Sequence, residues 1–438
     1  MRKSTSIPSS QCKRKLLPLA RTAAVLLVML IMRGGAFGYS VLTHEEIVDL
    51  LWMSEIRPLL LERFPGLTDQ QIKEAHAYAY GGSVIQDLGY YPFGNQEFSN
   101  LVHYVRSGDF VLELLAQSRD VNEYAFALGA LSHYTSDING HPAVNQSVAI
   151  QYPKLRAEFG RSVLYAENRT AHLKTEFGFD TLQVAKNRYA PEQYHDFIGF
   201  MVAEPLLERT FPVIYGLELK DVLTHEELSV GSFRFAVSRV IPEMTQVALQ
   251  VHKKDLIKET PDFARKKFLY RLSRSDYERE WGKTYSKPGL GTRFLAALLR
   301  FIPKVGPFKG LGFNNPTPQT EDLYIKSIDI TVDRYRGFLE EVRAGTLILP
   351  NSDLDSGNNT KGGEYSLADE TYASLLAELS KRKFDQTSPK LRDNILEFYA
   401  DPSLPIETKT DPVRWQNVQS NLGLLKSMTP SPSGAPAP

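Results

Sequence analysis

Apolar residues recur at helical spacing early in this 438-residue chain. One helix is predicted over 41–64, with Thr43 and Glu46 spaced as a capping box at its start. A second is predicted over 68–80, and the glycines at 81–82 would end it. The pattern therefore predicts a helical start to the folded chain.

The strongest apolar pattern predicts a helix over 121–137. Gly140 and Pro142 would end or kink it, because proline removes a helical hydrogen bond. Further helices are predicted over 181–252, 321–344 and 366–384. The protein is therefore expected to be mostly helical.

Three side chains that can bind metal stand in a column on this central stretch. His133, Asp137 and His141 are four residues apart, so a helix would place them above one another on one face. Each step rises about 6 Å, so the two imidazoles would lie roughly 12 Å apart along the axis. That length suits more than one metal ion. The alternative is a helix on which two histidines happen to align.

The composition of the chain limits the partners and the metal ligands that it can have. The chain has 51 Lys and Arg and 51 Asp and Glu residues, so it is formally neutral and no stable nucleic-acid partner is expected. Its one cysteine, Cys12, lies ahead of a short apolar run in the basic N-terminal region. We interpret 1–38 as a cleaved signal peptide, the alternative being an uncleaved anchor. The mature protein would be secreted or periplasmic and would bind metal without thiolates.

Cleavage after Gly38 would make Tyr39 the first residue. A free α-amine has a pKa near 8, so a metal ion can displace its proton, and the amine and carbonyl of Tyr39 would chelate the ion together. His44 could add an imidazole, or it could simply be a residue of the first helix.

Four further candidates are more ambiguous when each is taken alone. His172 and Glu176 would share one helical face. Asp87 lies in a Gly- and Pro-rich turn, where carboxylates usually bind backbone amides. His103 sits in a short aromatic stretch, where a core histidine is the alternative.

Together these groups resemble the zinc-dependent phospholipase C family over about residues 39–180. That family is all-α and is similar to the fungal single-strand nucleases with three zinc ions. The resemblance implies a multi-helix bundle binding two or three zinc ions, in which Asp137 bridges two of them. The ligands that it implies are Tyr39, His44, Asp87, His103, His133, Asp137, His141, His172 and Glu176.

Two positions depart from the family pattern. Tyr39 stands where tryptophan is usual, although backbone chelation does not depend on the side chain. His141 follows Asp137 by four residues, whereas bacterial phospholipases C have six. The closer spacing is similar to glycosylphosphatidylinositol-specific phospholipase D. The resemblance therefore leaves open the head group and which phosphodiester bond is cut.

The expected activity is hydrolysis of phospholipid by a metal-activated hydroxide, with Asp87 orienting the water or taking its proton. A nuclease or nucleotidase on the same metal cluster is the second hypothesis, and Tyr90, Tyr91 and Phe93 keep it open. The third hypothesis is a non-catalytic zinc-bound helical module. The oligomeric state is not predicted.

The second half of the chain gives weaker signals. Residues 293–313 are apolar with four basic residues and would either contact a membrane surface or form a core helix and loop. Residues 351–363 read as a polar linker, and their acidic positions match a calcium loop poorly. We divide the chain into five parts: 1–38, a signal peptide; 39–250, the catalytic domain; 251–350, a helical extension; 351–428, a linker with a C-terminal helical region; and 429–438, a disordered tail.

Overall fold

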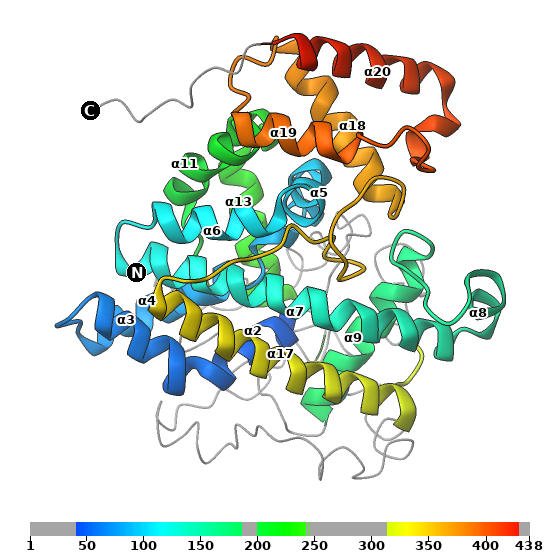
Figure 1. Ribbon diagram of the computed structural model, residues 1–438. Coiled ribbons are helices and arrows are strands. Elements are labelled where there is room, and N and C mark those ends of the chain that lie inside the picture. Colours follow the sequence, from blue (N-terminus) through cyan, green and yellow to red (C-terminus); the bar gives the residue numbers. More distant parts are fainter. Residues whose placement is uncertain (1–40, 186–198, 242–244, 246–312, 429–438) are drawn as a thin grey trace, which may run out of the picture.

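The computed structural model describes residues 41–185, 199–241, 245 and 313–428 (Figure 1). The predicted all-α class is confirmed, since the regular structure within these ranges is helical apart from one isolated bridge between Ser352 and Asn359. The α-helices are α2 (Val41–Leu51), α3 (Arg57–Arg63), α4 (Asp69–Gly82), α5 (Gln96–Tyr104), α6 (Ser107–Gln117), α7 (Val121–Gln151), α8 (Pro153–Phe159), α9 (Arg169–Ala185), α11 (Glu204–Tyr215), α12 (Leu219–Val222), α13 (Glu226–Phe235), α17 (Pro318–Ala344), α18 (Ser366–Lys381), α19 (Pro389–Phe398) and α20 (Pro412–Ser427). The π-helical segments are η1 (Trp52–Ile56) and η3 (Ala236–Val240), and the 3-10 segments are η2 (Ile85–Tyr90) and η6 (Glu407–Thr410).

The long helix α7 lies at the middle of the molecule, with α4 and α17 packed along it (Figure 1). The sequence suggested that Gly140 and Pro142 would end or kink this helix, but the helix assignment continues through both to Gln151. Pro142 costs one hydrogen bond to the Ile138 carbonyl. Packing against α17, α9 and α8 offsets that loss, so tertiary contacts override the local signal.

The first two predicted helices are present, but one of them starts differently. The 41–64 stretch forms α2, η1 and α3. The capping box predicted at Thr43 is wrong, because α2 already starts at Val41 and the Thr43 hydroxyl donates to Asp180 Oδ1 at 2.6 Å. A carboxylate of α9 thus holds the start of α2 in place of a local cap. The second helix, α4, has a true capping box at Thr68.

Residues 351–363 do not form the polar linker that their composition predicts. Ser352, Asp353 and Asp355 are each only 3% exposed. The Leu354 amide donates to the backbone carbonyl of His103 at 3.2 Å, which ties the segment to the end of α5. Residues 352–355 therefore pack inside the protein, whereas Asn358, Asn359 and Lys361 are exposed. The division of the chain into domains remains a prediction.

Three sequence predictions fall largely outside the described residues. These are the signal peptide at 1–38, the 293–313 segment, of which the structure describes only Phe313, and the 429–438 tail. Phe313 is buried and its ring meets that of Phe177. Within the described ranges, none of the helices combines the length and apolar character needed to cross a membrane.

The contact between α4 and α7 depends on glycine. A Cβ added to Gly129 on α7 would lie 2.1 Å from the Ala79 carbonyl oxygen, and one added to Gly82 on α4 would lie 1.9 Å from the Phe126 carbonyl oxygen. Real Cβ atoms do not approach oxygen so closely, so any larger residue would push the two helices apart.

Gly129→Ala should therefore destabilise the protein, by about 1–3 kcal/mol or more, because overpacking forces a backbone shift. Gly337→Ala on α17 is the matched control, since a Cβ there meets no atom within 4 Å. It should stabilise the helix by up to about 1 kcal/mol. Urea denaturation of both variants measures the difference. Equal midpoints for the two variants would contradict the close helix contact.

Candidate metal centre

Asp137 of α7 lies at the middle of a buried cluster of side chains that can bind metal. His133 and His141 lie one turn before and one turn after it, as the four-residue spacing predicts. His133 Nε2 lies 3.0 Å from Asp137 Oδ2, and His141 Nε2 lies 3.7 Å from Asp137 Oδ1. The histidines thus converge on one carboxylate from both sides.

Other elements bring further donors to the same place. His44 Nε2, from α2, and His103 Nε2, from α5, each lie 3.5 Å from an oxygen of Asp137. Asp87, from η2, lies 3.6 Å from His103 Nε2. The rings of His44 and His133 are stacked with centroids 4.4 Å apart. Segments up to about 90 residues apart therefore meet at Asp137.

Helix α9 supplies the remaining pair. His172 Nε2 lies 2.6 Å from Glu176 Oε1, one helical turn away. The ring of His172 lies 5.1 Å from that of His141. The pair therefore adjoins the end of the column that His141 forms.

The structure brings eight of the nine predicted ligands into three groups, two of which share His133. In each group the donor atoms lie within 4.8 Å of one another, which is close enough to share an ion. The groups are His44, His133 and Asp137; Asp87, His103 and His133; and His141, His172 and Glu176. The ninth predicted ligand, Tyr39, lies outside the described residues.

The donor set fits zinc. His103 Nδ1 lies 2.7 Å from the Ser99 carbonyl and His133 Nδ1 lies 2.9 Å from the Ser83 carbonyl. These carbonyls place the ring proton on Nδ1, which leaves each Nε2 lone pair directed at the centre, as metal-binding histidines require. Nitrogen and oxygen donors without thiolate are typical of catalytic zinc sites.

Several carboxylate oxygens have no hydrogen-bond partner outside the cluster in the part of the chain that is described. Both carboxylate oxygens of Asp87, Asp137 and Glu176 are buried there, and their close polar contacts are with the clustered histidines. Burying such groups without compensation costs several kcal/mol each by general estimates. A bound cation would remove that cost, so the cluster has the character of a metal centre.

Burial and neighbouring charges lower the pKa values of some residues of the cluster and raise those of others. Burial alone would raise the pKa of Asp137, but the imidazoles of His133 and His141 outweigh it and hold that pKa well below its usual value. Burial raises the pKa of Glu176 well above its usual value, with repulsion from Asp137 adding to the effect. Burial and the neighbouring His141 lower the pKa of His172, which favours the neutral ligand form.

Two other groups titrate near the physiological range. Burial raises the pKa of Asp87 to about 7. Burial would lower the pKa of His103, but its hydrogen bond to Asp137 and the charges of Asp87 and Asp137 raise it to about 9. Without metal, the centre therefore holds protons at neutral pH.

The remaining histidines fall outside the cluster or outside the described residues. His76 is a packed core residue. It is stacked on Trp52 with centroids 3.6 Å apart, and its Nε2 lies 2.9 Å from Asp49 Oδ1. His225 joins none of the three groups. His195 and His252 are not among the described residues.

Sequence reasoning missed Asp355. Its Oδ1 lies 3.7 Å from His141 Nδ1, and its Oδ2 accepts hydrogen bonds from Tyr104 and Tyr365. The acidic spacing at 351–355 was the only signal, and it pointed to a poor calcium loop. The contact with His141 spans more than 200 residues, which local spacing does not encode.

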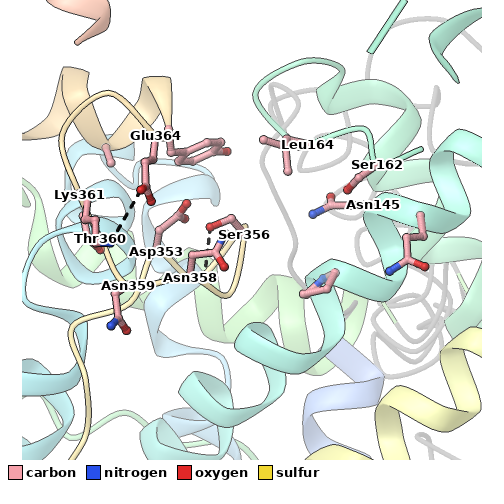
Figure 2. Close-up of a pocket in the computed structure, with 14 residues that line it drawn as sticks. Asn145, Ser162, Leu164, Asp353, Ser356, Asn358, Asn359, Thr360, Lys361 and Glu364 are labelled. Carbon is pink, nitrogen blue, oxygen red and sulfur yellow. Dashed lines mark hydrogen bonds and ion pairs between the residues drawn. The ribbon is translucent and has the colours of Figure 1, made fainter. Parts of the chain in front are cut away.

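A polar cavity of about 190 Å³ lies between the 353–365 segment and α7 (Figure 2). Figure 2 shows Asn145 and Ser162 on one side and Asp353 and Glu364 on the other. Tyr365, which donates to Asp355, also lines the cavity. The cavity is therefore connected to His141 through Tyr365 and Asp355.

Comparison with family models matches residues 43–224 to the model described as zinc dependent phospholipase C. The matched stretch contains the eight clustered donors and ends before the 351–365 segment. No curated protein and no solved structure matches the chain.

Zinc affinity should rise with pH. Zinc must displace the protons that Asp87 (pKa about 7) and His103 (pKa about 9) hold below these values, and the pKa values of His133 and Glu176 are raised as well. The apparent affinity should therefore rise from pH 6 to 9, most steeply at the acid end, where zinc displaces the most protons. Competition with a chelating dye from pH 6 to 9 measures this profile.

Asp87→Asn is the control for this assignment. It removes one titrating group, so zinc affinity should rise less steeply with pH below pH 7 than in the unsubstituted protein. An affinity that does not change with pH in the unsubstituted protein would contradict the assignment.

Proposed function

Because residues 43–224 form a domain of the zinc-dependent phospholipase C family, we propose that this protein is a secreted multi-zinc phosphodiesterase that hydrolyses phospholipids. The observation that carries the proposal is the convergence of four imidazoles on the buried Asp137 carboxylate. The nearby His172 and Glu176 supply the donors for a further ion.

The charge of the centre supports an anionic substrate. Asp87, Asp137, Glu176 and the adjacent Asp355 carry at most four negative charges, and the histidines carry none when they bind metal. Three divalent ions, one for each donor group, would bring six positive charges, so a fully loaded centre stays cationic. A cationic centre attracts the phosphate of a diester and offsets the negative charge that grows as the bond to phosphorus forms.

Zinc bound at such a centre supplies Lewis acidity toward phosphate oxygens and water. The chain's own residues then have separate tasks. Asp87 is assigned to orient the attacking water and accept its proton, since its carboxylate lies in the donor group with His103 and His133 and makes no hydrogen bond there. Asp137 joins the histidines of α2, α5 and α7 into one rigid arrangement.

The polar cavity beside the centre is assigned to the head group of the lipid. Asn145, Ser162 and Lys361 offer it hydrogen-bond donors and acceptors. The nuclease hypothesis finds less support here. Tyr90 and Tyr91 are buried and only the Phe93 ring is more than half exposed, so these side chains offer little surface for stacking nucleotide bases.

Hydrolysis by the zinc-loaded protein tests the proposal. Phosphatidylcholine and phosphatidylinositol vesicles should yield phosphate-containing products that a chelator abolishes and added zinc restores. Single-stranded DNA should remain intact. Cleavage of DNA but not of lipid would favour a nuclease, and a zinc-loaded protein inert on all three substrates would favour a non-catalytic module.

Asp137→Asn should lose bound zinc and at least about 100-fold in activity, because it weakens the ligand shared by four histidines. Asp369→Asn is the matched control. Asp369 accepts hydrogen bonds from the amides of Gly363 and Glu407 and belongs to none of the three donor groups. The control should keep its zinc and its activity. Full phosphodiesterase activity in Asp137→Asn would contradict the proposal.

We also propose that export and removal of residues 1–38 precede metal binding. Helix α2 starts two residues after Tyr39 and places His44 beside Asp137, so the new amine would lie near the first donor group in sequence. Mass spectrometry of the exported protein should find Tyr39 at the N-terminus. Two extra residues ahead of Tyr39 should lower the zinc content, whereas two extra residues at the C-terminus should not. Full zinc binding by the N-terminally extended protein would argue against this role of the amine.

A further inference from the structure

We infer that Asp355, which lies outside the matched domain, is a positioning residue of the metal centre. Its carboxylate holds the His141 imidazole so that Nε2 stays directed at the ions. The inference rests on the proposed zinc chemistry and adds to it a residue from the C-terminal half of the chain.

The two nitrogens of His141 face two different carboxylates. Nε2 lies 3.7 Å from Asp137 Oδ1 inside the centre, and Nδ1 lies 3.7 Å from Asp355 Oδ1 on the outer side. Asp355 therefore occupies the place next to Nδ1 that a positioning partner of a metal-binding histidine takes.

Two neighbouring histidines show the same arrangement with backbone partners. Ser99 O lies beside Nδ1 of His103, and Ser83 O lies beside Nδ1 of His133. Among the described residues, His141 Nδ1 makes no hydrogen bond to a carbonyl, and the Asp355 side chain from another part of the chain lies next to it instead.

The Asp355 carboxylate is itself held in a fixed orientation. Its Oδ2 accepts hydrogen bonds from the hydroxyls of Tyr104, at 2.8 Å, and Tyr365, at 2.5 Å. Its backbone carbonyl accepts a hydrogen bond from Asn145 Nδ2 at 3.0 Å. These contacts use one carboxylate oxygen and leave Oδ1 directed at His141.

The backbone on either side of Asp355 packs closely against α5 and α7. Leu354 donates its amide to the carbonyl of His103, itself a candidate ligand. Gly357 has a φ of +76°, and a Cβ there would lie 2.5 Å from the carbonyl oxygen of Ile138, the residue after Asp137. The backbone thus packs against α7 too closely for any other residue, and Asp355 is held in place.

Metal binding by Asp355→Ala and Asp355→Asn tests the inference. Loss of a partner of this kind costs about 10–100-fold in metal affinity, so Asp355→Ala should bind its weakest zinc ion that much less tightly. Asp355→Asn keeps a hydrogen-bond acceptor and should lose less. Both variants, loaded with cobalt(II), should shift the visible absorption bands, because the field at the His141 ion changes.

Asp369→Asn again serves as the control, because it removes a buried carboxylate of the same region without touching the centre. It should leave zinc affinity and the cobalt spectrum unchanged. Zinc affinity within twofold of the unsubstituted protein and an unchanged cobalt spectrum in Asp355→Ala would overturn the inference.

If Asp355→Ala does not fold, Tyr365→Phe decides the question. It removes one hydroxyl that holds Oδ2 but keeps the ring, so a shifted cobalt spectrum with native circular dichroism supports the inference and an unchanged spectrum overturns it. A zinc-loaded unsubstituted protein that hydrolyses no diester would overturn the proposed function alone, because the metal readouts do not depend on activity.

Discussion

The arrangement of the centre depends on one buried carboxylate that four imidazoles share. A carboxylate without water costs several kcal/mol unless opposite charge or hydrogen bonds replace the solvent. Asp137 is fully buried, and His44, His103, His133 and His141 surround it within 3.7 Å. Imidazoles satisfy a carboxylate fully only when they carry protons, whereas divalent ions between them satisfy carboxylates and neutral imidazoles together. The cluster is therefore organised for metal ions.

Much of the fold was predictable because helical periodicity is a local property. The helices at α2, α4 and α7 follow from apolar spacing, and Thr68 caps α4 as its sequence indicates. The errors occur where distant residues replace local signals. Asp180 holds the start of α2 in place of a cap at Thr43, and α7 passes Pro142 because neighbouring helices pack along it.

The site was predictable to the extent that its geometry is helical. Ligands four residues apart must share a helix face, so the column around Asp137 could be derived from spacing alone. Asp87 and His103 could not, because turns and separate helices bring them in; their grouping came from a family resemblance. Neither helical spacing nor the family resemblance pointed to Asp355. Its role depends on tertiary packing of a segment whose composition resembles a solvent-exposed linker.

The position of Asp355 couples the metal centre to the C-terminal helices. One continuous hydrophobic cluster runs from Val41 to Leu425, so α18 and α20 share a core with the helices that carry the ligands. The 351–365 segment connects that shared core to His141 through Tyr365 and Asp355. Any ion that binds the native centre stabilises every element whose folding the centre requires. Because Asp355 packs against a ligand, zinc should stabilise the C-terminal helices as well as the domain that holds it, although they contribute no ligand to the three donor groups.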